Sequence, residues 1–128
     1  MTVLELYNTA LALLNEVGTD AKDYPKLKLP YINLILAQCF VTENWIRRRK
    51  GEELLDAVPQ VAYDSDVLVY DAQFVRECLP YLLASMLAAD EDRDLSSVYA
   101  KMFARLEDKY LTVFGEQITD VYGEATDA

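Results

Sequence analysis

The stretch Leu95–Val113, with the sequence LSSVYAKMFARLEDKYLTV, decides the fold of this chain. Its apolar residues recur every three or four positions, which places them on one face of an α-helix. The stripe comprises Leu95, Val98, Tyr99, Met102, Phe103, Leu106, Tyr110 and Val113. We predict that this helix ends at Gly115, because glycine readily adopts the left-handed conformation that closes helices. Such a stripe is normally buried against other elements, so further helices are expected upstream.

A first helix is predicted over residues 3–17. Thr2 followed by Glu5 fits a capping box, in which each side chain accepts a hydrogen bond from the backbone N–H of the other residue. Apolar residues at helical spacing follow, and Gly18 supplies a closing position.

A second helix is predicted to start at Pro25 or Pro30, because proline is tolerated in the first turn of a helix. It should run to Lys50 and stop at Gly51, with the four cations of residues 47–50 at the negative end of the helix dipole. A start at Pro25 implies a kink at Pro30.

Between Glu52 and Asp71 the helical period is lost. The residues Tyr63–Asp66 are typical of a turn between two extended pieces, so we expect a small hairpin or an extended loop outside the helical packing. A third helix should follow, capped by Asp71. It should bend or restart at Pro80, because an interior proline removes a hydrogen bond and clashes with the preceding turn.

The predicted architecture is all-α. Four amphipathic helices can bury their stripes against one another, which favours a four-helix bundle-like domain over residues 1–114. Residues 115–128 are predicted to form a flexible C-terminal tail. A single domain suits a chain of 128 residues.

The charge and hydropathy of the chain limit its partners. Carboxylates outnumber Lys and Arg by 22 to 12, and the resulting net charge of −10 repels nucleic-acid phosphate. No apolar stretch reaches the roughly 20 residues that cross a bilayer, and the start of the chain does not have the pattern of a secretory signal. We therefore expect a protein of the cytoplasm that makes no membrane contact.

The residue types argue against catalysis. The chain has no histidine, which excludes a Ser-His-Asp triad, a Cys-His pair and a histidine-based metal site. Cys39 and Cys78 lie in apolar runs and are expected to be buried free thiols. The acidic residues 90–94 do not follow the spacing of a calcium loop, and no Gly-rich phosphate loop is present. No catalytic residue, cofactor or metal is predicted.

Two segments are candidates for partner contacts. The cations at the end of the second helix could bind an acidic neighbour, although cations in a last turn also stabilise a helix by themselves. The tail residues Ile118, Val121 and Tyr122 could add to the sheet edge of a partner or fill its groove, although disorder is common at such a terminus. Both alternatives stay open for each segment.

Several short motifs occur in a fixed order along the chain. They are Tyr31-Ile32-Asn33-Leu34, Glu43-Asn44 with Arg47, the residues Asp64–Tyr70, Leu79-Pro80-Tyr81-Leu82-Leu83-Ala84, and an acidic break before Tyr99 and Phe103. In this order they resemble the head–tail connector, or adaptor, proteins that tailed bacteriophages and prophages stack beneath the portal. The resemblance covers most of the chain. It departs at Leu82, where related sequences tend to carry glycine in Pro-Tyr-Gly-Leu-Ala.

The resemblance implies a non-enzymatic structural protein that forms a ring on the portal, dodecameric in the virion, and joins the DNA-filled head to the tail. It implies the portal protein and other head–tail proteins as partners, and DNA that passes through without specific binding. The protein would assemble in the host cytoplasm, where it can stay monomeric until it meets the portal. The residues expected to contact subunits or partners are Arg47, Arg48, Arg49, Lys50, Tyr63, Asp64, Asp66, Val67, Val69, Tyr70, Ile118, Val121 and Tyr122.

A second hypothesis is a small acidic regulatory or inhibitory protein that mimics nucleic acid and binds a basic host protein. Its helices and negative charge would suit that role equally well. A third hypothesis is an accessory subunit of an enzyme. Size separates the first two, since a connector should occur in rings or virions and a mimic as a monomer or dimer with its target.

Overall fold

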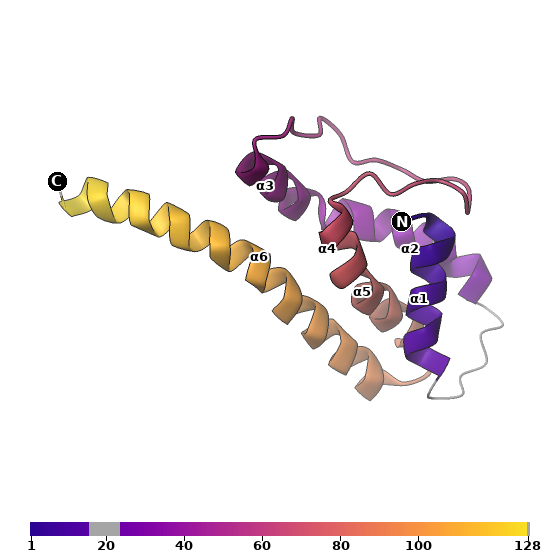
Figure 1. The fold of residues 1–128 in the computed structure, drawn as a ribbon. Coiled ribbons are helices and arrows are strands. Elements are labelled where there is room, and N and C mark those ends of the chain that lie inside the picture. Colours follow the sequence, from indigo (N-terminus) through magenta and orange to yellow (C-terminus); the bar gives the residue numbers. More distant parts are fainter. Residues whose placement is uncertain (16–23, 128) are drawn as a thin grey trace.

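The computed structural model describes the backbone of residues 1–15 and 24–127, and the side chains of residues 1–14 and 24–111. Within these residues the chain is all-α and has no β-strand, which confirms the predicted class (Figure 1). The helices are α1 Val3–Asn15, α2 Tyr24–Gln38, α3 Phe40–Lys50, α4 Ala72–Glu77, α5 Leu79–Ala88 and α6 Arg93–Asp127.

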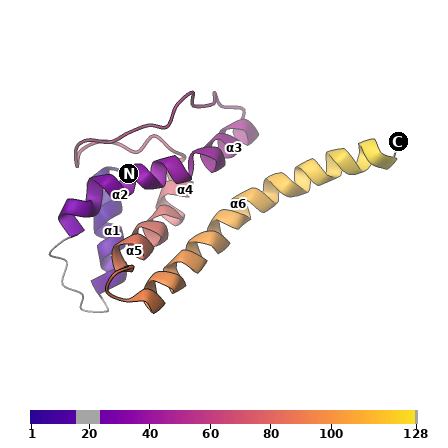
Figure 2. The ribbon, with the colours of Figure 1, turned by 180° about the vertical axis from the view of Figure 1, so that it is seen from behind.

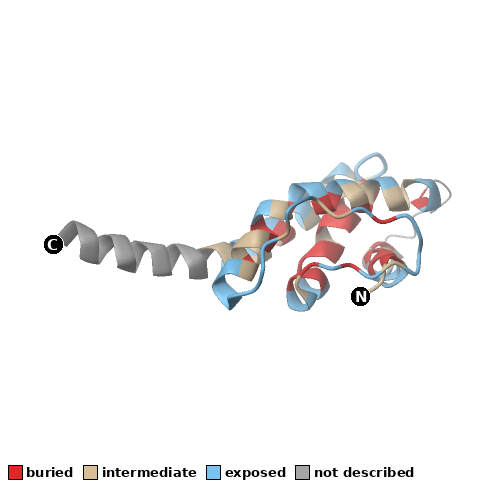
Figure 3. Cartoon of the chain, turned by 90° about the horizontal axis from the view of Figure 1, so that it is seen from above, coloured by how far each residue is buried: buried red, intermediate tan, exposed pale blue. Residues whose placement is uncertain are grey.

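Helix α5 is the centre of the packing. It contacts α1, α2, α4 and α6, and most of its own residues are buried (Figures 2 and 3). Its sequence, LPYLLASMLA, is apolar on almost every side, which is the composition of a helix that is covered all round. The stripe of α6 is less completely covered, because Phe103 is buried while Val98 is 51% exposed.

Local capping signals are confirmed. The N–H of Thr2 donates to Glu5 Oε1 at 3.1 Å, and the N–H of Glu5 donates to Thr2 Oγ1 at 3.2 Å. The predicted capping box is therefore present at the start of α1. Gly51 ends α3 with a φ of 73°, and the paired bonds from Gly51 N–H and Glu52 N–H to the last turn form a Schellman motif. The predicted closing position Gly18 lies outside the described residues.

The predicted second helix divides at Cys39, a break that the sequence did not predict. Helix α2 begins at Tyr24 and continues through Pro30, and Cys39 then leaves the helical conformation with φ −96° and ψ 7°. Helical hydrogen bonds continue across this residue, since the N–H of Cys39 donates to the carbonyl of Ile35 and the N–H of Glu43 donates to the carbonyl of Cys39, both at 2.9 Å. Helix α2 packs against α5, and helix α3 packs against α6. Both Cys39 and Cys78 are buried free thiols, as predicted.

The predicted third helix also has two parts. Asp71 caps α4 by accepting a hydrogen bond from the N–H of Phe74 at 3.0 Å. The chain leaves the helix at Cys78 and restarts with Pro80 in the first turn of α5, as expected for an interior proline.

The predicted end of the last helix at Gly115 is wrong, because α6 continues to Asp127. A glycine inside a helix costs only about 1 kcal/mol relative to alanine, which neighbouring helix-forming residues can offset. Val121 and Tyr122 follow Ile118 by three and four residues, which continues the helical period of the preceding stripe. The boundary predicted between residues 114 and 115 therefore falls inside a helix.

The segment between α3 and α4 is an extended loop, and the hairpin alternative does not form within the described residues. A single antiparallel bridge joins Val67 to Thr2. The predicted turn is present, since the N–H of Asp66 donates to the carbonyl of Tyr63 at 3.1 Å. The expectation that this segment lies outside the packing is wrong. It contributes three buried side chains to the core, those of Val61, Leu68 and Tyr70.

Candidate interaction surface

The loop over residues 52–71 is tied to α2 and α3 by two asparagines. Asn33 binds Val61 through two hydrogen bonds, accepting from its N–H at 2.8 Å and donating to its carbonyl at 3.1 Å. Asn44 binds Leu55 in the same way, with distances of 2.9 Å and 3.2 Å. An amide side chain carries one acceptor and two donors, so each asparagine replaces a missing strand partner for the loop backbone.

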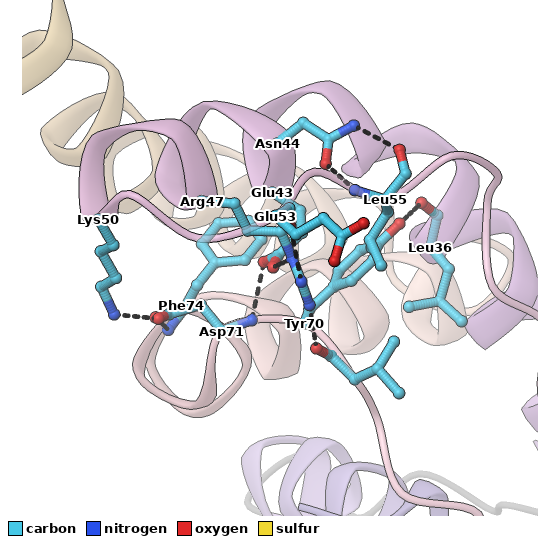
Figure 4. Close-up of polar contacts among 11 residues, drawn as sticks. Leu36, Glu43, Asn44, Arg47, Lys50, Glu53, Leu55, Tyr70, Asp71 and Phe74 are labelled. Atoms are coloured by element: carbon cyan, nitrogen blue, oxygen red, sulfur yellow. Dashed lines mark hydrogen bonds and ion pairs between the residues drawn. The ribbon is translucent and has the colours of Figure 1, made fainter.

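Glu43 and Arg47 hold the returning part of the loop (Figure 4). Glu43 Oε2 accepts from Arg47 Nε at 2.7 Å, and Oε1 accepts from the N–H of Asp71 at 2.7 Å. The guanidinium of Arg47 also donates to the carbonyls of Val69 at 2.9 Å and Glu53 at 3.2 Å. One carboxylate and one guanidinium thus join both ends of the loop to α3.

Burial and hydrogen bonding together shift the pKa values of the ionisable groups in this cluster. The side chain of Glu43 is 1% exposed, and burial raises its pKa, although the Asp71 N–H and Arg47 partly offset the shift. Lys50 and Asp71 form an ion pair, and the hydrogen bond that Lys50 donates to Asp71 raises the pKa of Lys50. Burial works against ionisation of Asp71, but its bonds from Lys50 and from backbone N–H groups outweigh this and lower its pKa.

Glu43 should contribute a loss of stability as the pH rises, opposite in sign to the contributions of Asp66 and Asp71, whose pKa values are lowered. Its pKa lies above the ordinary 4.5 in the folded chain, so the folded state binds this proton more tightly than the unfolded state does. As the pH rises above 4.5, the contribution of Glu43 to the free energy of unfolding therefore decreases, because the unfolded state releases this proton first. Glu43→Gln cannot ionise and should remove this slope, as measured by urea unfolding from about pH 4 to about pH 7. An identical slope in the variant would contradict the assignment.

The predicted basic cluster does not act as one surface. Arg47 and Lys50 bind the loop, which supports the alternative that these cations serve the fold. The guanidinium of Arg48 lies 5.6 Å from the centre of the Trp45 ring, at an exposed position. Arg49 is exposed and lines a groove that is described below.

The predicted loop contacts divide into outward and inward residues. Tyr63, Val67 and Val69 are 70%, 64% and 51% exposed, so their apolar surfaces are available to a partner. Tyr70 is 3% exposed and donates its hydroxyl to the carbonyl of Leu36, so the surface of this chain does not present its side chain to a partner. The reason is the alternation of side chains along an extended backbone, which turns Tyr70 inward where Val69 faces outward.

The two acidic contact candidates have structural partners. Asp64 forms an ion pair with Lys28 Nζ at 2.7 Å, which connects the tip of the loop to α2. The carboxylate of Asp66 accepts from the N–H groups of Ala62 at 2.7 Å and Tyr63 at 3.0 Å, which closes the turn and lowers the pKa of Asp66. The side chains of the tail candidates Ile118, Val121 and Tyr122 lie outside the described residues.

Two grooves were not predicted from the sequence. One, of about 260 Å³, lies beside α3 and the start of the loop and is lined by Phe40, Val41, Asn44, Trp45, Arg48 and Leu54. The other, of about 400 Å³, lies between α3, α4 and α6. Its lining residues are far apart in sequence. The helical period of α3 and α6 is the one signal that could have indicated that apolar and basic residues lie on the same face of these helices.

The described residues offer no arrangement for metal or thiol chemistry. Among them, no group of three or more Cys, Asp or Glu side chains is placed to hold a metal ion. Burial raises the pKa of both Cys39 and Cys78 to about 12, which keeps them as unreactive thiols. No helix in this part of the chain is long and apolar enough to cross a membrane.

Comparison with protein-family models, with curated proteins and with solved structures gave no match for this chain. What it does must therefore be inferred from its own residues and their arrangement.

Proposed function

We propose that this protein is a head–tail connector of a tailed bacteriophage or prophage, a non-enzymatic subunit that forms a ring on the portal and joins the DNA-filled head to the tail. The observation that supports this most is the exposed apolar edge of the loop, formed by Tyr63, Val67 and Val69. A partner that covers this edge would remove apolar surface from water, which is the main driving force of protein association.

The anchoring of the loop strengthens the proposal. Asn33, Asn44 and Arg47 fix its backbone by hydrogen bonds before any partner arrives. A surface that is already ordered loses less conformational entropy on binding, so more of the contact energy appears as affinity. The polar residues that carry the resemblance to connector proteins are therefore the ones that present the loop.

The rest of the proposed role follows from shape and charge. A four-helix bundle-like body would form the wall of the ring, with its sides against neighbouring copies in a head-to-tail interface that closes. The net charge of −10 would let DNA pass without being retained. The portal protein and other head–tail proteins are the proposed partners, in the host cytoplasm during assembly and then in the virion, and no membrane is involved.

Removing residues 115–128 should leave the domain folded and abolish its assembly on the portal. Folding should survive because the core residues among the described side chains end at Tyr110. Assembly should fail because the proposed contacts include Ile118, Val121 and Tyr122. Circular dichroism would report folding, and electron microscopy of mixtures with the portal protein would report rings. Rings that form equally well without these residues would count against the role of the tail.

The connector function itself is tested by the neighbouring genes and by the particle. Genes for a portal, a terminase or tail proteins should flank this one, and mass spectrometry of purified virions should detect the protein. A monomer or dimer that copurifies with a basic host protein, and is absent from particles, would instead favour the nucleic-acid mimic.

A further inference from the structure

The groove between α3, α4 and α6 combines an apolar floor with basic walls. Ile46, Leu106 and Tyr110 supply apolar surface. Three cations and two carboxylates line it, a net charge of +1 in a chain whose net charge is −10. The cations are Arg49, Lys50 and Lys109, and the carboxylates are Asp71 and Glu77.

The two carboxylates are already engaged inside the groove. Asp71 is paired with Lys50, and Glu77 accepts a hydrogen bond from the hydroxyl of Tyr110 at 3.1 Å. Lys109, from α6, is exposed at the rim. The chemistry that this groove would recognise is therefore an apolar segment that carries negative charge.

The last fourteen residues of the chain have that composition. They contain Ile118, Val121 and Tyr122 at helical spacing, and no Lys or Arg. Their carboxylates are Glu116, Asp120, Glu124 and Asp127. Apolar residues at spacings of three and four can enter a groove from one side of a helix while acidic residues meet its rim.

A chain cannot fill the groove with its own tail. Tyr110 lines the groove, and α6 continues without interruption to Asp127. At 1.5 Å per residue, Ile118 and Tyr122 lie roughly 12 Å and 18 Å further along the same helix axis, too far to fold back. A tail that fills the groove must therefore come from another copy, and a groove and a tail at different places on one chain make a heterologous contact.

We infer that the segment Gly115–Ala128 of one copy docks in the groove between α3, α4 and α6 of the next copy, with Lys109 facing its carboxylates. The inference rests on the proposed function, because it supplies the head-to-tail contact that a ring requires.

A synthetic peptide of residues 115–128, labelled with fluorescein, tests this contact against the full-length protein. Fluorescence anisotropy should show saturable binding that weakens as salt screens the charges. Lys109→Glu should weaken binding at least about fivefold, because it turns an attraction into a repulsion. Lys101→Glu is the matched control, since Lys101 is an exposed lysine of α6 outside the groove, and it should leave the affinity unchanged.

Two further measurements keep the test independent of folding defects. A peptide in which Ile118, Val121 and Tyr122 are replaced by alanine should bind at least about tenfold more weakly to the unaltered protein. Amide NMR shifts on titration should concentrate at groove residues such as Ile46, Gln73 and Tyr110. Absence of binding, equal binding to Lys109→Glu, or shifts located elsewhere would overturn the inference.

Failure of the docking contact can be distinguished from failure of the connector function. The peptide experiment needs neither the portal nor a virion. If the peptide does not bind but virions contain the protein, the connector proposal stands and the tail binds elsewhere. If the peptide binds as expected but virions do not contain the protein, self-association stands and the connector proposal fails.

Discussion

Replacing Glu43 with alanine should lower the free energy of unfolding by about 3 kcal/mol. The carboxylate accepts from Arg47 Nε and from the N–H of Asp71, both at 2.7 Å, and its side chain is 1% exposed. Without it, the Asp71 N–H has no acceptor at this position, and Arg47 loses the carboxylate with which it forms an ion pair. The end of the loop next to α4 should then detach from α3.

Urea unfolding at neutral pH measures this loss, and Glu52→Ala serves as the control because Glu52 is an exposed carboxylate near the end of α3. The control should change stability by at most about 0.5 kcal/mol. Hydrogen exchange adds a local readout, since the N–H of Asp71 should exchange faster in the variant. A loss below about 1 kcal/mol would mean that Arg47 holds the loop through its bonds to the carbonyls of Val69 and Glu53 alone.

The local features of the fold could be predicted because their causes lie within a few residues. The capping box of Thr2 and Glu5, the left-handed Gly51 and the Asp71 cap each depend on groups at most five residues apart in the chain. The restart at Pro80 is of the same kind, because the missing N–H of proline acts within one helical turn. Such signals survive in any tertiary context.

The anchoring of the loop could not be predicted. Asn33 and Asn44 bind backbone atoms 28 and 11 residues away. Every residue has the same backbone groups, so the sequence does not indicate which of them a distant side chain will bind. The same residues stand out in the motifs that resemble connector proteins, yet the sequence does not show that they present a loop. The same holds for Arg47, which is predicted as a partner contact. The position of an arginine at a helix end does not indicate which carbonyl groups it binds.

The regularity of an apolar stripe does not measure how deeply a helix is buried. The stripe of α6 is the most regular in the sequence because one side of that helix faces solvent, and Val98 is half exposed. Helix α5 is central and buried on most sides, so it has little periodicity to detect. The helix end predicted at Gly115 is wrong for a related reason. A glycine marks a helix end only where the following residues break the helical period.

Replacing Phe74 with alanine should cost about 4 kcal/mol of unfolding free energy, since Phe74 is fully buried and its removal leaves a cavity. Its ring meets that of Tyr110 edge to face, with centroids 5.4 Å apart and planes at 79°. This contact joins α4 to α6 beneath the groove lined by Tyr110, so the substitution should also loosen the floor of that groove.

Thermal and urea unfolding would measure the effect of Phe74→Ala, with Val98→Ala as the control at an exposed apolar position of α6. The control should lose less than about 0.5 kcal/mol. Phe74→Leu keeps most of the apolar volume and should therefore recover much of the stability while still removing the aromatic pair. If the leucine variant is stable but binds the tail peptide more weakly, Tyr110 needs the ring of Phe74 to be held in the groove. If alanine costs no more than leucine, α4 is not packed into the core.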